Sequence, residues 1–283
     1  AAGSTSTTVH ITVADDGVDE SDETFTVTLS SPGNATLGSA TILTYTIGDN
    51  DGAPTVSFVT NVSSGAETVT AVTLSIILTA ISGQNVSVDY TATGGTATGS
   101  GTDYTLASGT ATVTAGSTTT NIPLTIVNDT LDEADETIIV TISSPSSNVT
   151  LGTNTTFTYT ITDDDATPTI AFTSASSSGS ESVTPVSLSI SLSAASSFGV
   201  TVNYAVTGGT GASGSDYAMA SGTATISAGD TTTTASMTII NDSITESEET
   251  VIVTLSSPTN STLGANSTYT YTISNDDSSG GGV

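Results

Sequence analysis

Apolar residues alternate with Thr and Ser along most of this chain of 283 residues. Between residues 53 and 165 the alternation forms seven short runs, separated by segments rich in Gly, Ser, Asp and Asn. Side chains at a period of two point to opposite faces of a strand, so each run predicts an antiparallel strand with one buried face. β-branched Thr residues suit the outward face because they pack well on a pleated surface. The predicted strands carry Val56 and Phe58; Leu74, Ile76 and Leu78; Val86, Val88 and Tyr90; Ala111 and Val113; Ile122, Leu124 and Ile126; Ile138, Val140 and Ile142; Phe157, Tyr159 and Ile161.

The pattern recurs as an internal repeat. The segment "AGSTSTTVHITVADDGVDESDETFTVTLSSP" from Ala2 returns from Ala115 and again from Ala228, at a spacing of 113 residues each time. We therefore expect complete repeats at 52–165 and 166–277, the second half of a repeat at 1–51, and a flexible Gly-rich tail at 278–283. Seven strands in a repeat of this length are typical of an immunoglobulin-like sandwich. The predicted fold class is all-β, with tandem seven-stranded β-sandwiches.

The half-repeat at 1–51 contains only three predicted strands, which cannot close a sandwich alone. The complete repeats use their own strands. We therefore predict that the half-repeat is ordered only when polypeptide from outside the two complete repeats covers its apolar face. Such a partner, a head-to-tail copy or a neighbouring repeat of a longer chain, would propagate an open fibre. The three strands carry Val9, Ile11 and Val13; Phe25, Val27 and Leu29; Leu43, Tyr45 and Ile47.

Charge excludes several classes of partner. The chain has no Lys, no Arg and one His, and its formal net charge is −28. No cation is present to displace counterions from phosphates, so nucleic acid and anionic membrane surfaces are excluded. No apolar run reaches the roughly 18 residues of a membrane-spanning helix. The absence of Cys excludes disulfides and thiolate metal sites, so packing, strand pairing or bound ions must stabilise the fold.

The acidic residues gather at the connections between predicted strands. The stretch "NDTLDEADET" at 128–137 holds five carboxylates, and no basic side chain exists to pair with any of them. In the complete repeats the clustered residues are Glu67, Asp103, Asp129, Glu133, Glu136, Asp163, Asp164 and Asp165, and then Glu181, Asp216, Asp242, Glu246, Glu249, Asp276 and Asp277. The half-repeat has part of the set: Asp16, Glu20, Glu23, Asp49 and Asp51.

These motifs resemble those of the Calx-beta domain, a module of sodium–calcium exchangers and of many large extracellular adhesion proteins. The resemblance rests on the D-x-x-x-E-x-x-E spacing, the "SDY"-type turn, the early Glu and the terminal Asp run, and it covers nearly the whole chain. It implies a Ca²⁺ site at one end of each sandwich. We expect the protein to be extracellular, either secreted or at the cell surface.

The residue types agree with a calcium site. Calcium takes six to eight oxygen ligands, and about seven like charges repel one another unless a cation joins them. Neither thiolate nor imidazole accompanies the clusters, so zinc and copper are not indicated. The alternative is that the clusters are solvated acidic loops without an ion. Asn275 and Asn50 stand where other repeats have Asp, so affinity should differ between the sites.

The sequence gives little support for catalysis or for other kinds of functional site. His10 is the one imidazole and alternation places it toward solvent, and the many Ser residues have no base partner. Paired carboxylates serve glycoside hydrolysis, but here they recur in every repeat, which favours structural ions over one active site. Asn34, Asn148 and Asn260 open Asn-x-Thr triplets, either glycan acceptors or turns.

The sequence therefore predicts a non-enzymatic secreted structural protein, a calcium-stiffened tandem-repeat stalk or filament subunit. The alternative is a calcium-dependent adhesin that recognises a glycan or a host protein. The absence of Trp gives no obvious platform for sugar rings.

Overall fold

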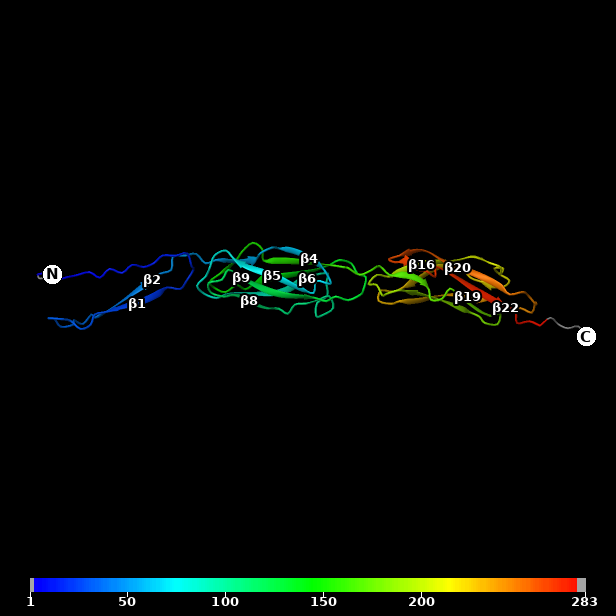
Figure 1. Cartoon of the computed structure of the whole chain (residues 1–283), viewed down its shortest axis with the longest axis horizontal. Coiled ribbons are helices and arrows are strands. Elements are labelled where there is room, and N and C mark those ends of the chain that lie inside the picture. The colour runs from blue at the N-terminus through cyan, green and yellow to red at the C-terminus, as the bar shows by residue number, and fades with distance from the viewer. Residues whose placement is uncertain (1–2, 279–283) are drawn as a thin grey trace, which may run out of the picture. The chain divides into compact units, whose positions relative to one another are not determined.

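The structure is a computed structural model that describes residues 3–278 (Figure 1). These residues form strands and turns, and they include no helix long and apolar enough to cross a membrane. Of the predicted Gly-rich tail, residues 279–283 lie outside the described range. The chain divides into two compact units. The first comprises the residues up to Val127 with Glu136–Ile161, and the second comprises Asn128–Asp135 with the residues from Thr162 on.

The middle repeat is a sandwich of two five-stranded sheets, with strand orders β4-β12-β10-β6-β8 and β11-β3-β5-β9-β7. Its cyan-to-green strands are seen in Figure 1. The strands are β3 (Thr55–Phe58), β4 (Val62–Ala66), β5 (Ala71–Leu78), β6 (Val86–Gly95), β7 (Tyr104–Thr105), β8 (Gly109–Val113), β9 (Thr119–Ile126), β10 (Glu136–Ser143), β11 (Thr150–Leu151) and β12 (Thr156–Thr162).

The third repeat has the same architecture, with sheet orders β14-β22-β20-β16-β18 and β17-β19-β15-β13-β21. The strands are β13 (Thr169–Phe172), β14 (Ser176–Ser180), β15 (Val186–Leu192), β16 (Val200–Gly209), β17 (Tyr217–Ala218), β18 (Gly222–Ile226), β19 (Thr232–Ile239), β20 (Glu249–Thr259), β21 (Thr262–Leu263) and β22 (Thr268–Ser274).

The prediction of tandem β-sandwiches is confirmed, and all seven strands expected in the middle repeat are present. The expected number of strands is too low, because β4, β7 and β11 complete the two sheets. The sequence of β4, "VSSGA", has no apolar alternation, since this strand lies at the edge of its sheet. The other two strands are only two residues long, too short to show a period.

Alternation and register together build the cores. In the β10–β12 pair Ile138 lies opposite Tyr159 and Val140 opposite Phe157, so four apolar side chains share one face. None of the four is more than 4% exposed. The third repeat has an equivalent core of its own, which includes Leu188, Ile190, Val251, Val253 and Tyr271.

A glycine at the end of β6 and of β16 starts the loop that leads to the later acidic residues. Gly209 has φ of +115°, and a Cβ there would overlap the Thr250 carbonyl oxygen. Gly95 has φ of +117°, and a Cβ there would overlap the Thr137 carbonyl oxygen in the same way. Only glycine allows both the conformation and the close approach, so these two positions fix where each loop leaves its sheet.

The half-repeat forms two strands instead of three. β1 (Glu23–Thr28) pairs with β2 (Ile42–Ile47), with Phe25 opposite Tyr45. The strand predicted over Val9, Ile11 and Val13 is wrong, because this segment has no ladder partner. Its counterpart β9 pairs with β5 in the middle repeat, and residues 3–51 contain no strand of that kind.

The apolar face of the half-repeat is exposed. Val9, Leu43 and Tyr45 are 74%, 61% and 50% exposed, whereas their counterparts Ile122, Phe157 and Tyr159 are buried in the middle core. The expected covering polypeptide stays a prediction.

His10 is exposed as expected. In the Asn-x-Thr loops, the Asn148 and Asn260 amides donate to the carbonyl oxygens of Asn85 and Gly199, consistent with a turn role.

Candidate metal centre

Three carboxylates from two strand ends meet in the third repeat. Glu181 follows β14, and Asp276 and Asp277 follow shortly after β22. Because β14 and β22 pair in parallel, the carboxyl ends of both strands lie at the same end of the sheet. One carboxylate oxygen from each residue lies within 4.8 Å of the others. Glu181 is only 4% exposed, so one member of this first triad is held out of water.

A second triad in the same repeat joins Asp216, Glu246 and Glu249, again within 4.8 Å. Asp216 stands directly before β17 and is 8% exposed, and Glu249 is the first residue of β20. Asp216 Oδ2 accepts a hydrogen bond from the Ala212 amide, and the Asp216 carbonyl accepts one from the Ile240 amide. These bonds fix the carboxylate against the loop that carries Glu246.

Asparagine and aspartate side chains shape the loop between β19 and β20. The Ile244 amide donates to Asp242 Oδ1 at 2.7 Å, which closes a local turn. The Glu246 amide donates to Asn275 Oδ1 at 3.2 Å, and Asn275 Nδ2 donates to the Asp277 carbonyl at 2.9 Å. Asn275 therefore links the loop to the end of β22. In the middle repeat Asp163 makes the matching link, because its Oδ1 accepts a hydrogen bond from the Glu133 amide.

Electrostatics joins the two triads and Asp242 into one group of seven carboxylates, which we call the third-repeat cluster. Burial raises the pKa of Glu181, and the charges of Glu246, Asp276, Asp277 and Asp242 raise it further. Partial burial also raises the pKa of Glu246, together with the charges of Asp216, Asp242 and Asp277. Each triad thus feels the charge of the other.

One carboxyl group of this cluster has a strongly raised pKa. A side-chain hydrogen bond with Asp216, then burial and neighbouring charges, raise the pKa of Glu249 to about 7. In contrast, hydrogen bonds from Ser182 lower the pKa of Asp276. The cluster therefore contains a carboxylate that is protonated near neutral pH and one that stays ionised.

The third-repeat cluster fits a hard divalent cation. Glu249 Oε2 and Asp277 Oδ2 are buried and have no hydrogen-bond donor. Buried polar atoms are nearly always paired in folded proteins, and the neighbouring carboxylates of a triad can be joined only by a proton or a cation. The sequence provides no Lys or Arg for the purpose. An oxygen-only donor set of this charge suits Ca²⁺.

The predicted residues of the middle repeat occupy the same positions along the chain. In the first unit, buried Glu67 follows β4, Asp103 precedes β7 and Glu136 opens β10. In the second unit, Asp165 Oδ2 is buried and has no hydrogen-bond donor. Burial raises the pKa of Asp165, and the charges of Asp163, Asp164, Asp129 and Asp132 raise it further. Asp164 is exposed.

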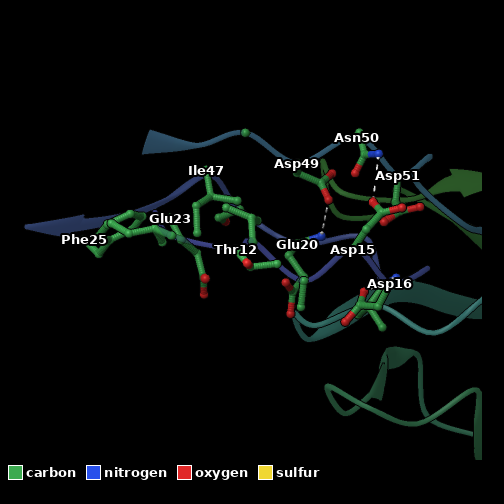
Figure 2. Close-up of a pocket in the computed structure, with 16 residues that line it drawn as sticks. Thr12, Asp15, Asp16, Glu20, Glu23, Phe25, Ile47, Asp49, Asn50 and Asp51 are labelled. Atoms are coloured by element: carbon green, nitrogen blue, oxygen red, sulfur yellow. Dashed lines mark hydrogen bonds between the residues drawn. The ribbon is translucent and has the colours of Figure 1, made fainter. Parts of the chain in front are cut away.

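The partial set of the half-repeat also comes together, around a cavity of about 380 Å³ (Figure 2). Glu20 is exposed, but partial loss of hydration raises its pKa, with contributions from the charges of Asp16, Glu23, Asp49 and Asp51. The Glu20 amide donates to Asp49 Oδ1 at 3.4 Å, as the dashed line in Figure 2 shows. Unlike Glu181, every ligand candidate here is at least partly open to solvent.

The sequence analysis did not predict two kinds of acidic residue that hold these sites together. Asp22 and Asp135 accept the backbone amides of Asp49 and Asp163 and so hold the terminal Asp run in place. Their recurrence at the spacing of 113 residues was a usable signal. Asp15 likewise accepts a hydrogen bond from the Asn50 side chain.

Comparisons with known proteins agree with this picture. The model of the Calx-beta domain matches residues 1–51, 49–165 and 163–277. Among solved structures, CBD12 from CALX1.2 is 19% identical at a TM-score of 0.39, covering 77% of this chain and 99% of that one. The calcium binding domain CBD12 of CALX1.1 is 21% identical at a TM-score of 0.39, covering 74% and 81%. The curated proteins include no match.

Proposed function

The chain belongs to the Calx-beta domain family, and from that premise we propose that each complete repeat binds Ca²⁺ at the acidic end of its sandwich. Domains of this family are calcium-binding modules. In the third repeat the ligands would come from the third-repeat cluster, and in the middle repeat from the residues at matching positions. The half-repeat would provide an incomplete site, because it has no counterpart of Glu67 or Asp103.

The observation that carries the proposal is the pair of orphaned oxygens, Glu249 Oε2 and Asp277 Oδ2, in a cluster without any basic side chain. A bound Ca²⁺ would supply the positive charge that this cluster lacks. The protein itself would position the carboxylate oxygens before the ion binds. Ser182 keeps Asp276 ionised, and the Ala212 amide and Asn275 fix Asp216 and the Glu246 loop.

We further propose a structural role outside the cell, as a segment of a tandem-repeat stalk or filament. The linkers "DNDGAP" and "DDDATP" are short, and each begins with candidate ligands and ends in a proline that restricts the backbone. Calcium at the ligands would therefore also stiffen the start of each linker. The recurrence of the acidic set in every repeat supports a structural ion, since one active site would need only one copy.

Completion of the half-repeat by the first half of another repeat, from a longer chain or from a neighbouring copy, is part of this proposal. β1 and β2 correspond to β10 and β12, which in the middle repeat pair with β6 and β4 in one sheet and bury their apolar side chains in the core. A polypeptide carrying the first half of a repeat, added head to tail, would cover the exposed apolar face of β1 and β2 and continue the series.

The test is calorimetric titration of calcium into the chelator-treated chain, combined with thermal melting. An ion that binds only the folded state at a hundredfold excess over Kd adds about 2.7 kcal/mol. For a repeat of this size we expect the melting temperature to rise by roughly 10 °C. Glu181→Gln and Asp216→Asn should each reduce the heat and the shift.

Asp230→Asn is the matched control, because it removes one charge from an exposed turn of the same repeat outside both triads. It should titrate like the parent chain. A melting temperature that is the same in calcium and in chelator would refute the proposed function.

A further inference from the structure

One acidic residue in each D-x-x-D-E loop turns away from the solvent. Asp132 stands beside Glu133 in the loop of the middle repeat, yet it is 7% exposed and belongs to none of the carboxylate groups among the described residues that could hold a metal ion. It lies in the second unit, where Asn128–Asp135 packs with the third repeat. Its partner is Ser196, in the loop between β15 and β16, which is 1% exposed.

The contact between Asp132 and the Ser196 loop is a set of specific hydrogen bonds. Ser196 Oγ donates to Asp132 Oδ2 at 2.7 Å, and the Ser197 amide donates to the Asp132 carbonyl at 3.0 Å. Ser196 Oγ in turn accepts the Phe198 amide at 3.2 Å, and the Ser196 carbonyl accepts the Gly229 amide at 2.9 Å. The loop of the third repeat is therefore built around the hydroxyl that binds Asp132.

The same contact occurs one repeat earlier, within the first unit. Ser82 Oγ lies 3.2 Å from Asp19 Oδ2, and the Gly83 amide donates to the Asp19 carbonyl at 2.9 Å. Both residues are buried, at 9% for Asp19 and 1% for Ser82. The Gln84 amide donates to Ser82 Oγ and the Gly116 amide to the Ser82 carbonyl, as at Ser196.

A buried carboxylate is costly unless it is hydrogen-bonded, and this chain has no cation to pair with one. Hydroxyl and amide donors are therefore the means available for binding an acidic loop. Two independent copies with the same donors, acceptors and burial indicate a recurring docking surface rather than a chance contact.

The third repeat differs at this position. Its loop reads "NDSITESEET", so Thr245 stands where Asp19 and Asp132 stand in the earlier loops, and Thr245 is exposed. Thr has a shorter side chain and no carboxylate to accept the buried hydroxyl.

We propose that the Ser82 and Ser196 loops are docking surfaces for the acidic loop of the preceding repeat, and that Asp at the position of Asp132 is the residue they recognise. The partner that such a surface fits is a Calx-beta repeat on the N-terminal side whose loop carries this Asp. A repeat with Thr there, such as the third, is not held by a following repeat in this way. This inference does not depend on calcium binding, because neither Asp132 nor Ser196 belongs to a carboxylate group among the described residues that could hold a metal ion.

Hydrogen–deuterium exchange of the whole chain at saturating calcium tests the proposal. The readout is the exchange rate of the Ser197 and Phe198 amides, and amides of β15 report on the fold. Asp132→Thr, which copies the third repeat, should raise exchange of the two loop amides roughly tenfold or more, since a hydrogen bond to a charged group is lost. Asp132→Asn keeps an acceptor oxygen and should retain most of the protection.

Thr245→Asp is the matched control, because it introduces the same residue in the loop that has no following repeat among residues 3–278; it should leave both amides unchanged. Ser196→Ala should raise exchange of the Ser197 amide as Asp132→Thr does. It decides the matter by this amide alone if Asp132→Thr also disturbs β15, because the Phe198 amide loses its own acceptor in Ser196→Ala. Unchanged protection of the Ser197 amide in Asp132→Thr or, in that case, in Ser196→Ala would overturn the proposal. Failure of calcium titration in the parent chain would instead refute the proposed function and leave this comparison intact.

Discussion

Replacing Glu249 by Gln should stabilise the third repeat in chelator and destabilise it in calcium. The reason is the raised pKa of Glu249 beside Asp216. In the calcium-free protein above neutral pH, the Glu249 carboxyl must ionise next to the Asp216 side chain. A Gln side chain at this position would instead donate a hydrogen bond from its amide to the Asp216 carboxylate without a second charge. In calcium the same change removes a charged ligand.

The magnitude follows from the raised pKa. The pKa of Glu249 shifts from 4.5 to about 7, and at about 1.36 kcal/mol per pH unit the full shift corresponds to roughly 3 kcal/mol. Glu249 is partly exposed, so solvent screening reduces this to about 1–2 kcal/mol. The folded state binds the proton more tightly than the unfolded state, so its contribution is present below pH 4.5 and is lost as pH rises through about 7. In chelator the parent chain should therefore lose stability over that window.

Urea or thermal unfolding in chelator at pH 5 and pH 8 measures the effect. The difference between Glu249→Gln and the parent should grow from near zero at low pH to about 1–2 kcal/mol at pH 8, and it should change sign in calcium. Glu248→Gln removes the same charge from the exposed neighbouring position and should show neither change. Equal or lower stability of Glu249→Gln in chelator at pH 8 would refute the interpretation that the Glu249 carboxyl has a raised pKa.

Two further predictions concern the backbone and the half-repeat. Gly209→Ala should destabilise the third repeat by about 1–3 kcal/mol, because the new Cβ would overlap the Thr250 carbonyl oxygen. The adjacent Gly208→Ala, whose nearest neighbour would be Ile252 Cδ1 at 3.7 Å, should cost much less in the same urea titration, and equal costs would contradict the steric argument. Fusing a second copy of residues 53–114 ahead of the chain should cover the half-repeat, slow amide exchange in β1 and β2 and lower the binding of a hydrophobic dye. If exchange in these strands stays as fast as in the parent chain, the face is not one that the first half of a repeat covers.

The sequence predicted strands well where the partner strand is present and failed where it is absent. Ile122, Leu124 and Ile126 alternate with polar residues and form β9, which pairs with β5. Val9, Ile11 and Val13 have the same pattern and form no strand. Alternation in the sequence predicts which face a strand would bury. It does not predict whether a partner strand is present to form the hydrogen bonds that make the segment a strand. β4, with the sequence "VSSGA", fails in the opposite direction, because its backbone pairs at an edge while its side chains carry no apolar period.

The acidic loops show a second limit of pattern reasoning, and also its physical basis. In "NDTLDEADET" the charges of Asp129, Asp132 and Glu133 look alike, and spacing alone does not show that Asp132 is buried against Ser196. The difference lies in what each carboxylate meets. Oxygens that face other carboxylates, such as Glu249 Oε2 and Asp277 Oδ2 in the third repeat, have no donor and call for a cation from solution. Oxygens that face a neutral hydroxyl and backbone amides, as at Asp132, are satisfied within the protein. In a chain without Lys or Arg, these are the two remaining ways to offset a buried negative charge, and the acidic loop of the middle repeat carries residues of both kinds. A single Asp-to-Thr difference, as at Thr245, would then alter the joint to the next repeat while the metal ligands around it stay the same.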